Sequence, residues 1–239
     1  MKSRIPSFEN LILFQDDDYL VVNKPPFLSS LEDRQDTTNL LQMARSFLPG
    51  AQLCHRLDKD TSGALIIAKH PEAYRSMAIH FEKRRTVKQY HTIVEGIHDL
   101  REMKISAPIL NVKGSKARID YKNGKPSLTI FDSLKAYRKH TLVQCQPVTG
   151  RMHQIRIHLL SIDAPIVGDL NYGGSPFFLS TIKRNYQLGK FEVERPLINR
   201  LALHARTLIF PLMNQSIMNV EAPYPKDFEI LLKQLEKNT

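Results

Sequence analysis

Five short runs of apolar and β-branched residues between positions 87 and 148 constrain the fold of this chain more than any other feature. Two turn sequences, NVKGS at 111–115 and NGKP at 123–126, separate several of them. Short runs divided by turns are typical of neighbouring antiparallel strands, because parallel neighbours need a long crossover between them. The predicted strands of this antiparallel meander are 87–96, 104–110, 116–122, 128–139 and 140–148.

The rest of the chain mixes further strands with amphipathic helices. Strands are predicted at 19–26, 64–69, 201–211 and 216–223, and helices at 38–50, 71–85, 151–162 and 225–237. The pattern therefore predicts an α+β fold with a mixed, mainly antiparallel central sheet flanked by helices. Residues 173–200 are rich in Pro, Gly, Phe and Arg, which favours an irregular surface insertion.

The composition is that of a folded protein with an excess of positive charge. The 239 residues are long enough for one large domain, and 42% of them are hydrophobic. The formal net charge is +10, which produces a field that attracts nucleic acids and acidic membranes. A basic surface also aids solubility, so the charge alone names no partner.

The cysteines and the hydrophobic runs predict the compartment. The two cysteines, Cys54 and Cys145, have neither a CxxC nor a zinc-ligand spacing. The N-terminus has no secretory pattern, and no run reaches the roughly 18 apolar residues that cross a bilayer. We therefore expect a cytoplasmic protein without a membrane segment, a disulfide framework or a structural zinc ion.

The stretch HRLDKDTSG at 55–63 carries more charge than a turn requires. Thr61, Ser62 and Gly63 account for a turn, and Asp60 beside them is readily explained as a turn residue. His55, Arg56 and Asp58 need another explanation. Asp58 with Asp60 would suit a sugar hydrolase that uses paired carboxylates, but their spacing within one turn is weak evidence for it.

A second charged stretch, GRMHQIRIH at 150–158, opens the predicted helix 151–162. Arg151 would lie in the first helical turn, where a cation opposes the helix dipole, so we expect an anion nearby. Arg156 falls on the apolar side and needs an acidic partner once buried. Asp58 is the first candidate for this partner, and Asp169 or a purely structural pair are the alternatives.

The histidines of this helix do not predict a metal site. His153 and His158 are five residues apart, which is not the same-face spacing of an HExxH zinc helix. His55 with Asp58 forms only an isolated HxxD. We expect His153 and His158 to make fixed hydrogen bonds that orient their neighbours, and we expect no metal.

Taken together, the charged stretches resemble a known family. HRLDKDTSGALIIAK, VKQYHTIVEG, PVTGRMHQIRIHL, APIVGDLNYGG and LALHARTLIFP occur in this order and resemble successive motifs of the RluA-type pseudouridine synthases. The likeness covers about Asn23 to Pro211. It implies an enzyme that isomerises uridine in ribosomal or transfer RNA, on a long, bent, mainly antiparallel sheet crossed by a basic cleft.

The resemblance assigns roles to five residues. Asp58 would be the catalytic carboxylate, and Arg56 would help to extrude the target nucleotide. Tyr90 would lie against the base and assist late proton removal, Arg156 would pair with the aspartate, and Leu203 would line the pocket. Without the motifs, Tyr90 would be interpreted as a core aromatic of a strand and Arg56 as a solvated surface residue.

The implied chemistry explains why an aspartate and an arginine are needed. The reaction moves uracil from an N-glycosidic to a C-glycosidic bond without any net change of atoms or electrons, so no cofactor is expected. An ionised Asp58 would either attack C1′ or remove the C2′ proton, and a neighbouring Arg156 would keep its pKa low. The uridine must leave its stack first, because its reacting atoms are otherwise inaccessible.

The chain departs from many relatives in two places. About 20 residues precede the first predicted strand, so we expect no N-terminal S4 module, a single catalytic domain over 1–239 and no obligatory protein partner. After NKPP the family often has a glycine and a His-Pro pair, whereas this chain has FLSSLEDR at 27–34.

RNA would then be held by the catalytic domain itself. Besides Arg56 and Leu203, the candidate substrate-binding residues are His55, Lys83, Arg84, Arg85 and Arg151, with segment 173–200 as a further candidate. Each basic residue taken alone also fits a solvated surface. Two other functions stay open on the sequence: an RNA-binding protein or folding chaperone that has lost turnover, and the sugar hydrolase.

Overall fold

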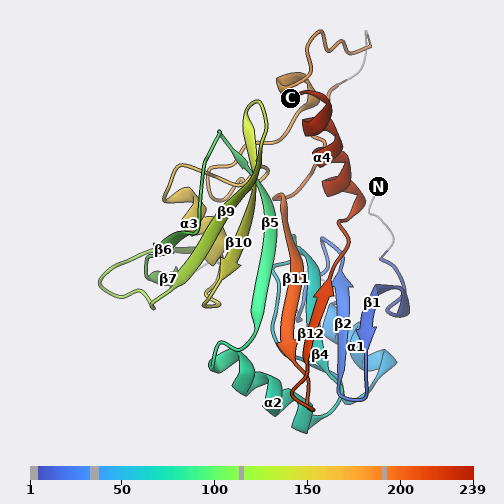
Figure 1. Ribbon diagram of the computed structural model, residues 1–239. Coiled ribbons are helices and arrows are strands. Elements are labelled where there is room, and N and C mark those ends of the chain that lie inside the picture. Colours follow the sequence, from blue (N-terminus) through green and yellow to red (C-terminus); the bar gives the residue numbers. More distant parts are fainter. Residues whose placement is uncertain (1–4, 33–37, 113–115, 190–192) are drawn as a thin grey trace. The chain divides into compact units, whose positions relative to one another are not determined.

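The computed structural model describes residues 5–32, 38–112, 116–189 and 193–239 (Figure 1). Their contacts divide the chain into two compact units. The first unit contains Met1–Gln89 and His204–Pro223, and the second contains Tyr90–Leu203 and Tyr224–Thr239.

The first unit is built on a mixed sheet. Strand β4 (Ser62–Ala68) is buried along its whole length and runs parallel to β11 (Leu203–Pro211). The strand order is β1 (Ile12–Gln15), β2 (Tyr19–Lys24), β4, β11. In addition, β3 (Gln52–Leu53) pairs with β4, and β12 (Ile217–Glu221) pairs with β11. All pairs other than β4 with β11 are antiparallel. The sequence pattern did not predict β1 or β3, because they are too short or too weakly buried to show a periodic signal.

Helices of the first unit begin at recognisable caps. These are the short 3₁₀ helix η1 (Glu9–Leu11), α1 (Leu40–Phe47) and α2 (Pro71–Glu82). Asn39 and Gln42 form a reciprocal capping box at the start of α1, and Pro71 occupies the first turn of α2. One face of α2 contributes Ala73 and Met77 to a core shared with the strands.

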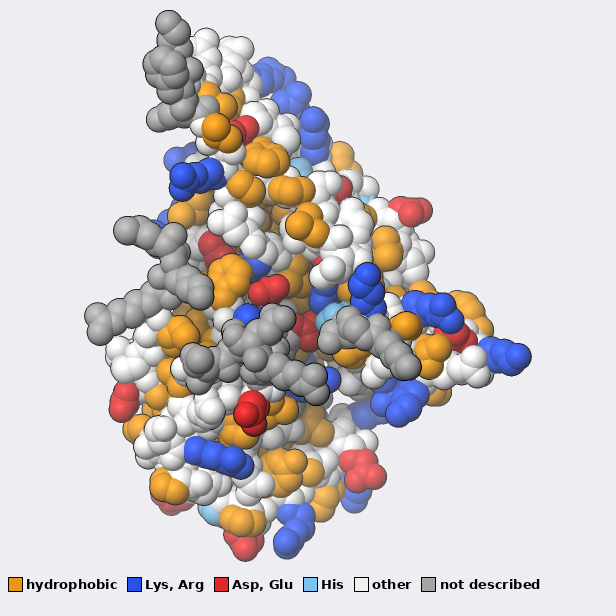
Figure 2. Space-filling model, turned by 180° about the vertical axis from the view of Figure 1, so that it is seen from behind, with side chains coloured by type: hydrophobic (Ala, Val, Ile, Leu, Met, Phe, Trp, Pro, Cys, Tyr) orange, Lys and Arg blue, Asp and Glu red, His pale blue; other side chains and the backbone are white. Residues whose placement is uncertain are grey.

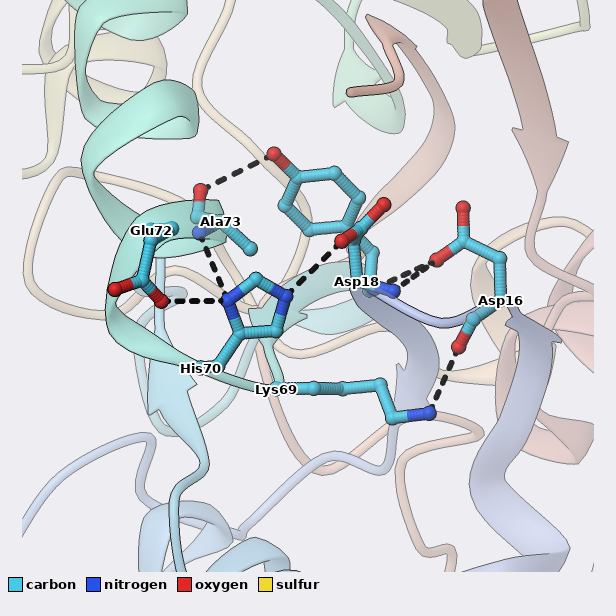
Figure 3. A network of polar contacts seen from close by, with 7 residues as sticks. Asp16, Asp18, Lys69, His70, Glu72 and Ala73 are labelled. Carbon is cyan, nitrogen blue, oxygen red and sulfur yellow. Dashed lines mark hydrogen bonds and ion pairs between the residues drawn. The ribbon is translucent and has the colours of Figure 1, made fainter. Parts of the chain in front are cut away.

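A polar network fixes the start of α2 (Figure 3). The His70 ring lies 3.0 Å from the Asp18 carboxylate through Nε2 and 3.0 Å from the Glu72 carboxylate through Nδ1. Beside it, the Lys69 ammonium donates to the carbonyl of Asp16 at 2.8 Å. Because Asp16 and Asp18 follow β1 and precede β2, these bonds attach that turn to the helix.

The second unit contains an antiparallel sheet with the order β5, β10, β9, β6. A separate hairpin pairs β7 with β8. The bounds are β5 (Val87–Glu95), β10 (His140–Pro147), β9 (Leu128–Ala136), β6 (Met103–Ser106), β7 (Ile109–Val112) and β8 (Lys116–Ile119). The single strand predicted at 104–110 is thus two strands, since Pro108 lies at the break and has no N–H to donate to a ladder.

Two α-helices complete the second unit. Helix α3 (Gln154–Leu160) packs against β8, β9 and β10. Helix α4 (Lys226–Lys237) is tied to β9 by an ion pair between Lys135 and Glu236. The described part of segment 173–200 is irregular apart from the 3₁₀ helix η2 (Leu179–Thr181). Phe177, Ile182 and Ile198 are buried, so the segment is anchored by its apolar residues and is more than a surface insertion.

These findings confirm the α+β class and the mainly antiparallel sheet structure. The single catalytic domain and the bend of the sheet stay predictions. None of the helices within the described ranges has the length and apolar character needed to span a bilayer. Asp33 and Arg34 of the divergent loop, and residues 190–192 of segment 173–200, lie outside the described residues.

Candidate active site

Asp58 lies in the loop between β3 and β4 of the first unit. Its carbonyl accepts the N–H of Thr61 at 3.1 Å, which closes a turn directly after it. The preceding residue, Leu57, is bound twice by the Ser30 hydroxyl, which donates to the Leu57 carbonyl at 2.7 Å and accepts the Leu57 N–H at 3.1 Å. The backbone on both sides of Asp58 is therefore held in place.

Lys24 holds the other side of this loop and was not identified from the sequence. Its ammonium is fully buried and donates to the carbonyls of Lys59, Leu28 and Pro25 at 3.1, 2.8 and 3.0 Å. A buried ammonium needs such compensation, because leaving water without partners costs several kcal/mol. The available signal was a lysine ending an apolar strand at NKPP.

The last two residues of the HRLDKDTSG motif, Ser62 and Gly63, have a structural role. The Ser62 hydroxyl lies 2.9 Å from Nδ1 of His204, whose Nε2 donates to the Ala222 carbonyl at 3.1 Å. Gly63 has a φ of +118°, and a side chain there would clash with the backbone of Ala205. Ser62 and Gly63 thus join the parallel strands β4 and β11, which explains why this motif and LALHA are both present.

His55 packs into the first unit as a neutral ring. Its Nε2 accepts the N–H of Ile66 at 3.2 Å, and the ring centroid lies 5.3 Å from that of Phe81. Burial, together with the nearby charge of Lys88, lowers the pKa of His55 to about 3. A substrate contact by His55 stays a prediction, as does the role of Arg56, which is exposed.

Lys83, Arg84 and Arg85 follow the end of α2 and are all exposed. The helix ends at Glu82, three residues before the predicted end, because Arg84 adopts a left-handed φ of 55°. Cations after a helix C-terminus are favoured by the helix dipole, so their position has a local reason as well. Their contact with RNA stays a prediction.

In the second unit, Arg156 of α3 is paired with Asp169. Its Nε and Nη2 donate to the two carboxylate oxygens at 2.6 and 2.7 Å, and both side chains are almost completely buried. The guanidinium also lies 4.6 Å from the ring centroid of Tyr172. The expected acidic partner of Arg156 is confirmed as Asp169, the alternative named above, and the pairing with Asp58 stays a prediction.

The APIVGDLNYGG motif supplies this carboxylate from a tight loop. The N–H groups of Tyr172 and Gly174 bond to the carbonyl of Asp169 at 3.0 and 2.9 Å. Gly168 has a φ of +78°, and a side chain there would clash with the carbonyl of Arg200. The glycines of the motif are therefore required for the close backbone packing that presents Asp169 to Arg156.

The prediction that Arg151 opens a helix is wrong. Helix α3 begins at Gln154, because His153 has a left-handed φ of 53° and the Gln154 side chain accepts from the hydroxyl of Thr149 and the N–H of Arg151. The argument for an anion near Arg151 based on the helix dipole therefore fails. Arg151 is exposed, and its Nε donates to the carbonyl of Pro126 at 3.2 Å.

The two histidines of the motif make fixed hydrogen bonds, as predicted. His153 Nδ1 lies 2.8 Å from the hydroxyl of Tyr172. His158 is fully buried, with Nε2 3.0 Å from the carbonyl of Ala107 and Nδ1 2.9 Å from the hydroxyl of Thr129. Burial lowers the pKa of His158. Within the described ranges, no group of three or more His, Cys, Asp or Glu side chains is arranged to hold a metal ion.

Tyr90 and Leu203 are buried side chains of the second unit. Tyr90 lies on β5 opposite Cys145 of β10. The Leu203 carbonyl accepts from Nη1 of Arg200 at 3.3 Å, and Arg200 forms a bidentate pair with Asp227 at 2.8 and 3.0 Å. Arg200 was not identified from the sequence, since nothing in its own neighbourhood indicates a partner 27 residues away.

Comparison with known proteins identifies the family. The profile described as RNA pseudouridylate synthase matches residues 18–161. The chain is 36% identical to ribosomal large subunit pseudouridine synthase C of Buchnera aphidicola subsp. Baizongia pistaciae, over 95% of this chain and 71% of the relative. It is 34% identical to the protein of the same name from Escherichia coli K12, over 97% of this chain and 72% of the relative.

Solved structures agree with the sequence comparison. Human RNA pseudouridylate synthase domain containing 4 superposes with a TM-score of 0.71 at 26% identity, covering 96% of this chain and 95% of that one. Human RNA pseudouridylate synthase domain containing 1 gives 0.68 at 31% identity, with 93% and 86% covered. The chain belongs to the RNA pseudouridylate synthase family and is an RNA pseudouridine synthase, an enzyme that isomerises uridine in RNA.

Proposed function

We propose that this enzyme isomerises uridine in ribosomal large-subunit RNA and that Asp58 is its catalytic carboxylate. The choice of RNA is supported by the curated relatives, which are named for the ribosomal large subunit and match nearly the whole chain. A transfer RNA substrate is the other alternative implied by the motifs. The cytoplasm, where ribosomal RNA would be met, remains the expected compartment.

The observation that carries the assignment of Asp58 is the anchoring of its backbone. Leu57 is bound by Ser30, the Asp58 carbonyl closes a turn, and the Lys59 carbonyl is bound by Lys24. The backbone of three consecutive residues is therefore fixed, while Asp58 itself is only partly buried. Catalytic groups need this combination, because misplacement by about 1 Å can cost 100-fold in rate.

The reaction balances without any other reactant. The bond between N1 and C1′ breaks and a bond between C5 and C1′ forms, while C5 loses a proton to water and N1 gains one. Asp58 would serve either as the nucleophile at C1′ or as the base for the C2′ proton. Both roles require the ionised carboxylate.

The other motif residues would assist this step. Arg56 would occupy the space left by the extruded nucleotide, and Tyr90 would lie against the free base. Arg156 would favour the charged form of the catalytic aspartate, and Leu203 would contribute an apolar wall. These roles rest on the family motifs.

Release of label from C5 tests the choice of RNA. Transcripts of large-subunit ribosomal RNA and of transfer RNA would be prepared with tritium at C5 of uridine and incubated with the enzyme. We expect tritium release from the large-subunit transcripts at a rate well above that from transfer RNA. Release from transfer RNA alone would contradict the proposed substrate.

Mapping in cells provides an independent test. Pseudouridines would be mapped across total RNA from a strain that lacks the gene and from the same strain with the gene restored. We expect one or more large-subunit positions to lose pseudouridine and to regain it on restoration. Loss confined to other RNA classes would overturn the proposal.

A further inference from the structure

An exposed aromatic ring and four cations follow one another along β8 and the next turn of the second unit, and Arg151 of the GRMHQIRIH motif adds a fifth cation. We call this set the 116–125 surface. The 116–125 surface covers β8 and the turn that follows it, and it includes one cation from the segment before α3. Its members are Lys116, Arg118, Tyr121, Lys122, Lys125 and Arg151, and all are exposed.

The turn that carries Tyr121 is rigidly defined. The Asp120 carboxylate accepts the N–H groups of Lys122 and Asn123 at 3.1 and 2.9 Å, and the Asp120 carbonyl accepts the Gly124 N–H at 2.8 Å. A side chain at Gly124 would clash with this carbonyl. Tyr121 and Lys122 are therefore fixed at the tip of a closed turn, with their side chains in solvent.

The five cations lie on β8, in the turn itself and in the segment before α3. Lys116 and Arg118 flank the buried Ala117 on β8, so alternation places both on the exposed face of the hairpin. Lys125 ends the turn, and Arg151 is held beside it by its bond to the Pro126 carbonyl. Five cations against the carboxylate of Asp120 leave a formal charge of +4.

Charge alone would not single out this surface. Lys and Arg side chains are spread over the face drawn in Figure 2. What distinguishes the 116–125 surface is Tyr121, which is 80% exposed, whereas the other exposed aromatic residues, Phe27, Phe47 and Tyr74, reach 46%, 39% and 38%. Tyr121 is the most exposed aromatic residue in the described part of the chain.

An exposed ring between cations matches the chemistry of unpaired RNA. Bases stack on aromatic rings, and neighbouring Lys and Arg side chains neutralise the phosphates that link them. A duplex keeps its bases stacked on one another, so it would meet only the cations. A membrane would favour an apolar cluster that inserts into the bilayer, whereas Tyr121 is accompanied by Lys122, Asn123 and Lys125.

We propose that the 116–125 surface is a platform for unpaired nucleotides of the RNA substrate, with a base stacked on Tyr121. This inference rests on the proposed action on ribosomal RNA and adds a second place where that RNA is held. Tyr121 would contribute to binding and to the choice of single-stranded segments, and it would take no part in the isomerisation.

Binding of an RNA without uridine tests the platform separately from catalysis. The probes are a fluorescein-labelled oligocytidylate of about 12 nucleotides and a labelled duplex of about 12 base pairs. We expect Tyr121→Ala to weaken oligocytidylate binding by about 5- to 150-fold and to leave duplex binding within about twofold. Tyr121→Phe should bind like the wild type, because the ring is kept.

A matched control uses Tyr74, an exposed tyrosine of α2 in the first unit. Tyr74→Ala should leave oligocytidylate binding unchanged. Lys122→Gln and Lys125→Gln should each reduce the slope of log K against log salt by about 0.7. The midpoint of thermal unfolding should be the same for the Tyr121 variants and the wild type, because the ring is exposed.

The outcomes separate the platform from the proposed function. Tyr121-dependent binding of oligocytidylate by a protein that releases no tritium from ribosomal RNA would support the platform and overturn the proposed substrate. Normal tritium release with identical oligocytidylate binding by Tyr121→Ala and the wild type would overturn the platform alone. The platform would also be overturned if Tyr121→Ala weakened the binding of oligocytidylate and of the duplex equally. Tyr121-dependent binding to anionic vesicles without any RNA binding would overturn it as well.

Discussion

The loops that carry Asp58 and Asp169 use a buried cation in different ways. In the first unit, Lys24 donates to backbone carbonyls, including that of Lys59 next to Asp58. In the second unit, Arg156 binds the Asp169 carboxylate itself through two bonds. Lys24 therefore fixes the path of a loop, whereas Arg156 makes the carboxylate part of the core. A buried acid in a motif can be structural, and an acid on an anchored loop is the better catalytic candidate.

Removing the Asp169 carboxylate should have the largest effect on stability. Asp169→Ala leaves the Arg156 guanidinium buried without its bidentate partner, so we expect a loss of about 3–5 kcal/mol in the free energy of unfolding. Urea denaturation measures it. The exposed pair of Arg101 and Asp99 provides the control, since Asp99→Ala should leave the free energy of unfolding nearly unchanged. A loss below about 1 kcal/mol for Asp169→Ala would contradict the structural role.

Removing the Lys24 ammonium should have an intermediate effect. Lys24→Met leaves up to three carbonyls without a donor, but it also removes the desolvation cost of a buried charge, so we expect a loss of about 2–3 kcal/mol. Lys69→Met removes one bond of a half-buried lysine and should cost about 1 kcal/mol or less. Equal losses for the two variants in urea denaturation would show that Lys24 does not anchor the loop as described.

The His70 network should have the smallest effect, and it should depend on pH. Hydrogen bonds to Asp18 and Glu72 raise the pKa of His70 above 6.5 in the folded protein. The stabilisation is therefore complete below pH 6.5 and is lost as the pH rises through the folded pKa. Because the His70 side chain is 37% exposed and solvent screens its ion pairs, we expect a loss of about 0.5 kcal/mol or less between about pH 5.5 and 8.5.

His70→Asn is the control for this pH effect. Asparagine keeps a side-chain acceptor at the start of α2 but does not titrate, so the difference in unfolding free energy between the variant and the wild type should shrink as the pH rises. A difference that grows with pH would show that the raised pKa has been assigned with the wrong sign.

The sequence was sufficient to predict most elements of the fold. Strand β10 alternates buried and partly buried residues along most of its length, and α1 and α2 begin at clear caps, so local patterns determine them. The start of α3 could not be predicted, because it depends on the left-handed backbone of His153 and on contacts of the Gln154 side chain with Leu128 and Thr129. Such contacts form only after the sheet has folded.

The motifs located the candidate site but did not show how its parts are held. Ser62 and Gly63 were interpreted as turn residues, whereas they join β4 to β11 through His204 and Ala205. The role of Lys24 could not be predicted, because its partners are backbone carbonyls and every residue type has one. Arg156 was expected to need an acid, and the sequence could not decide between two aspartates at different distances along the chain.

The catalytic role of the Asp58 carboxylate can be tested by a substitution that hardly changes the shape of the side chain. Asp58→Asn and Asp60→Asn would be compared with the wild type for tritium release from C5-labelled large-subunit RNA, and for RNA binding by fluorescence anisotropy. We predict that Asp58→Asn lowers release by about 1,000-fold or more while RNA binding stays within a few-fold, and that Asp60→Asn retains most of the activity. Tritium release by Asp58→Asn at the wild-type rate would contradict the account.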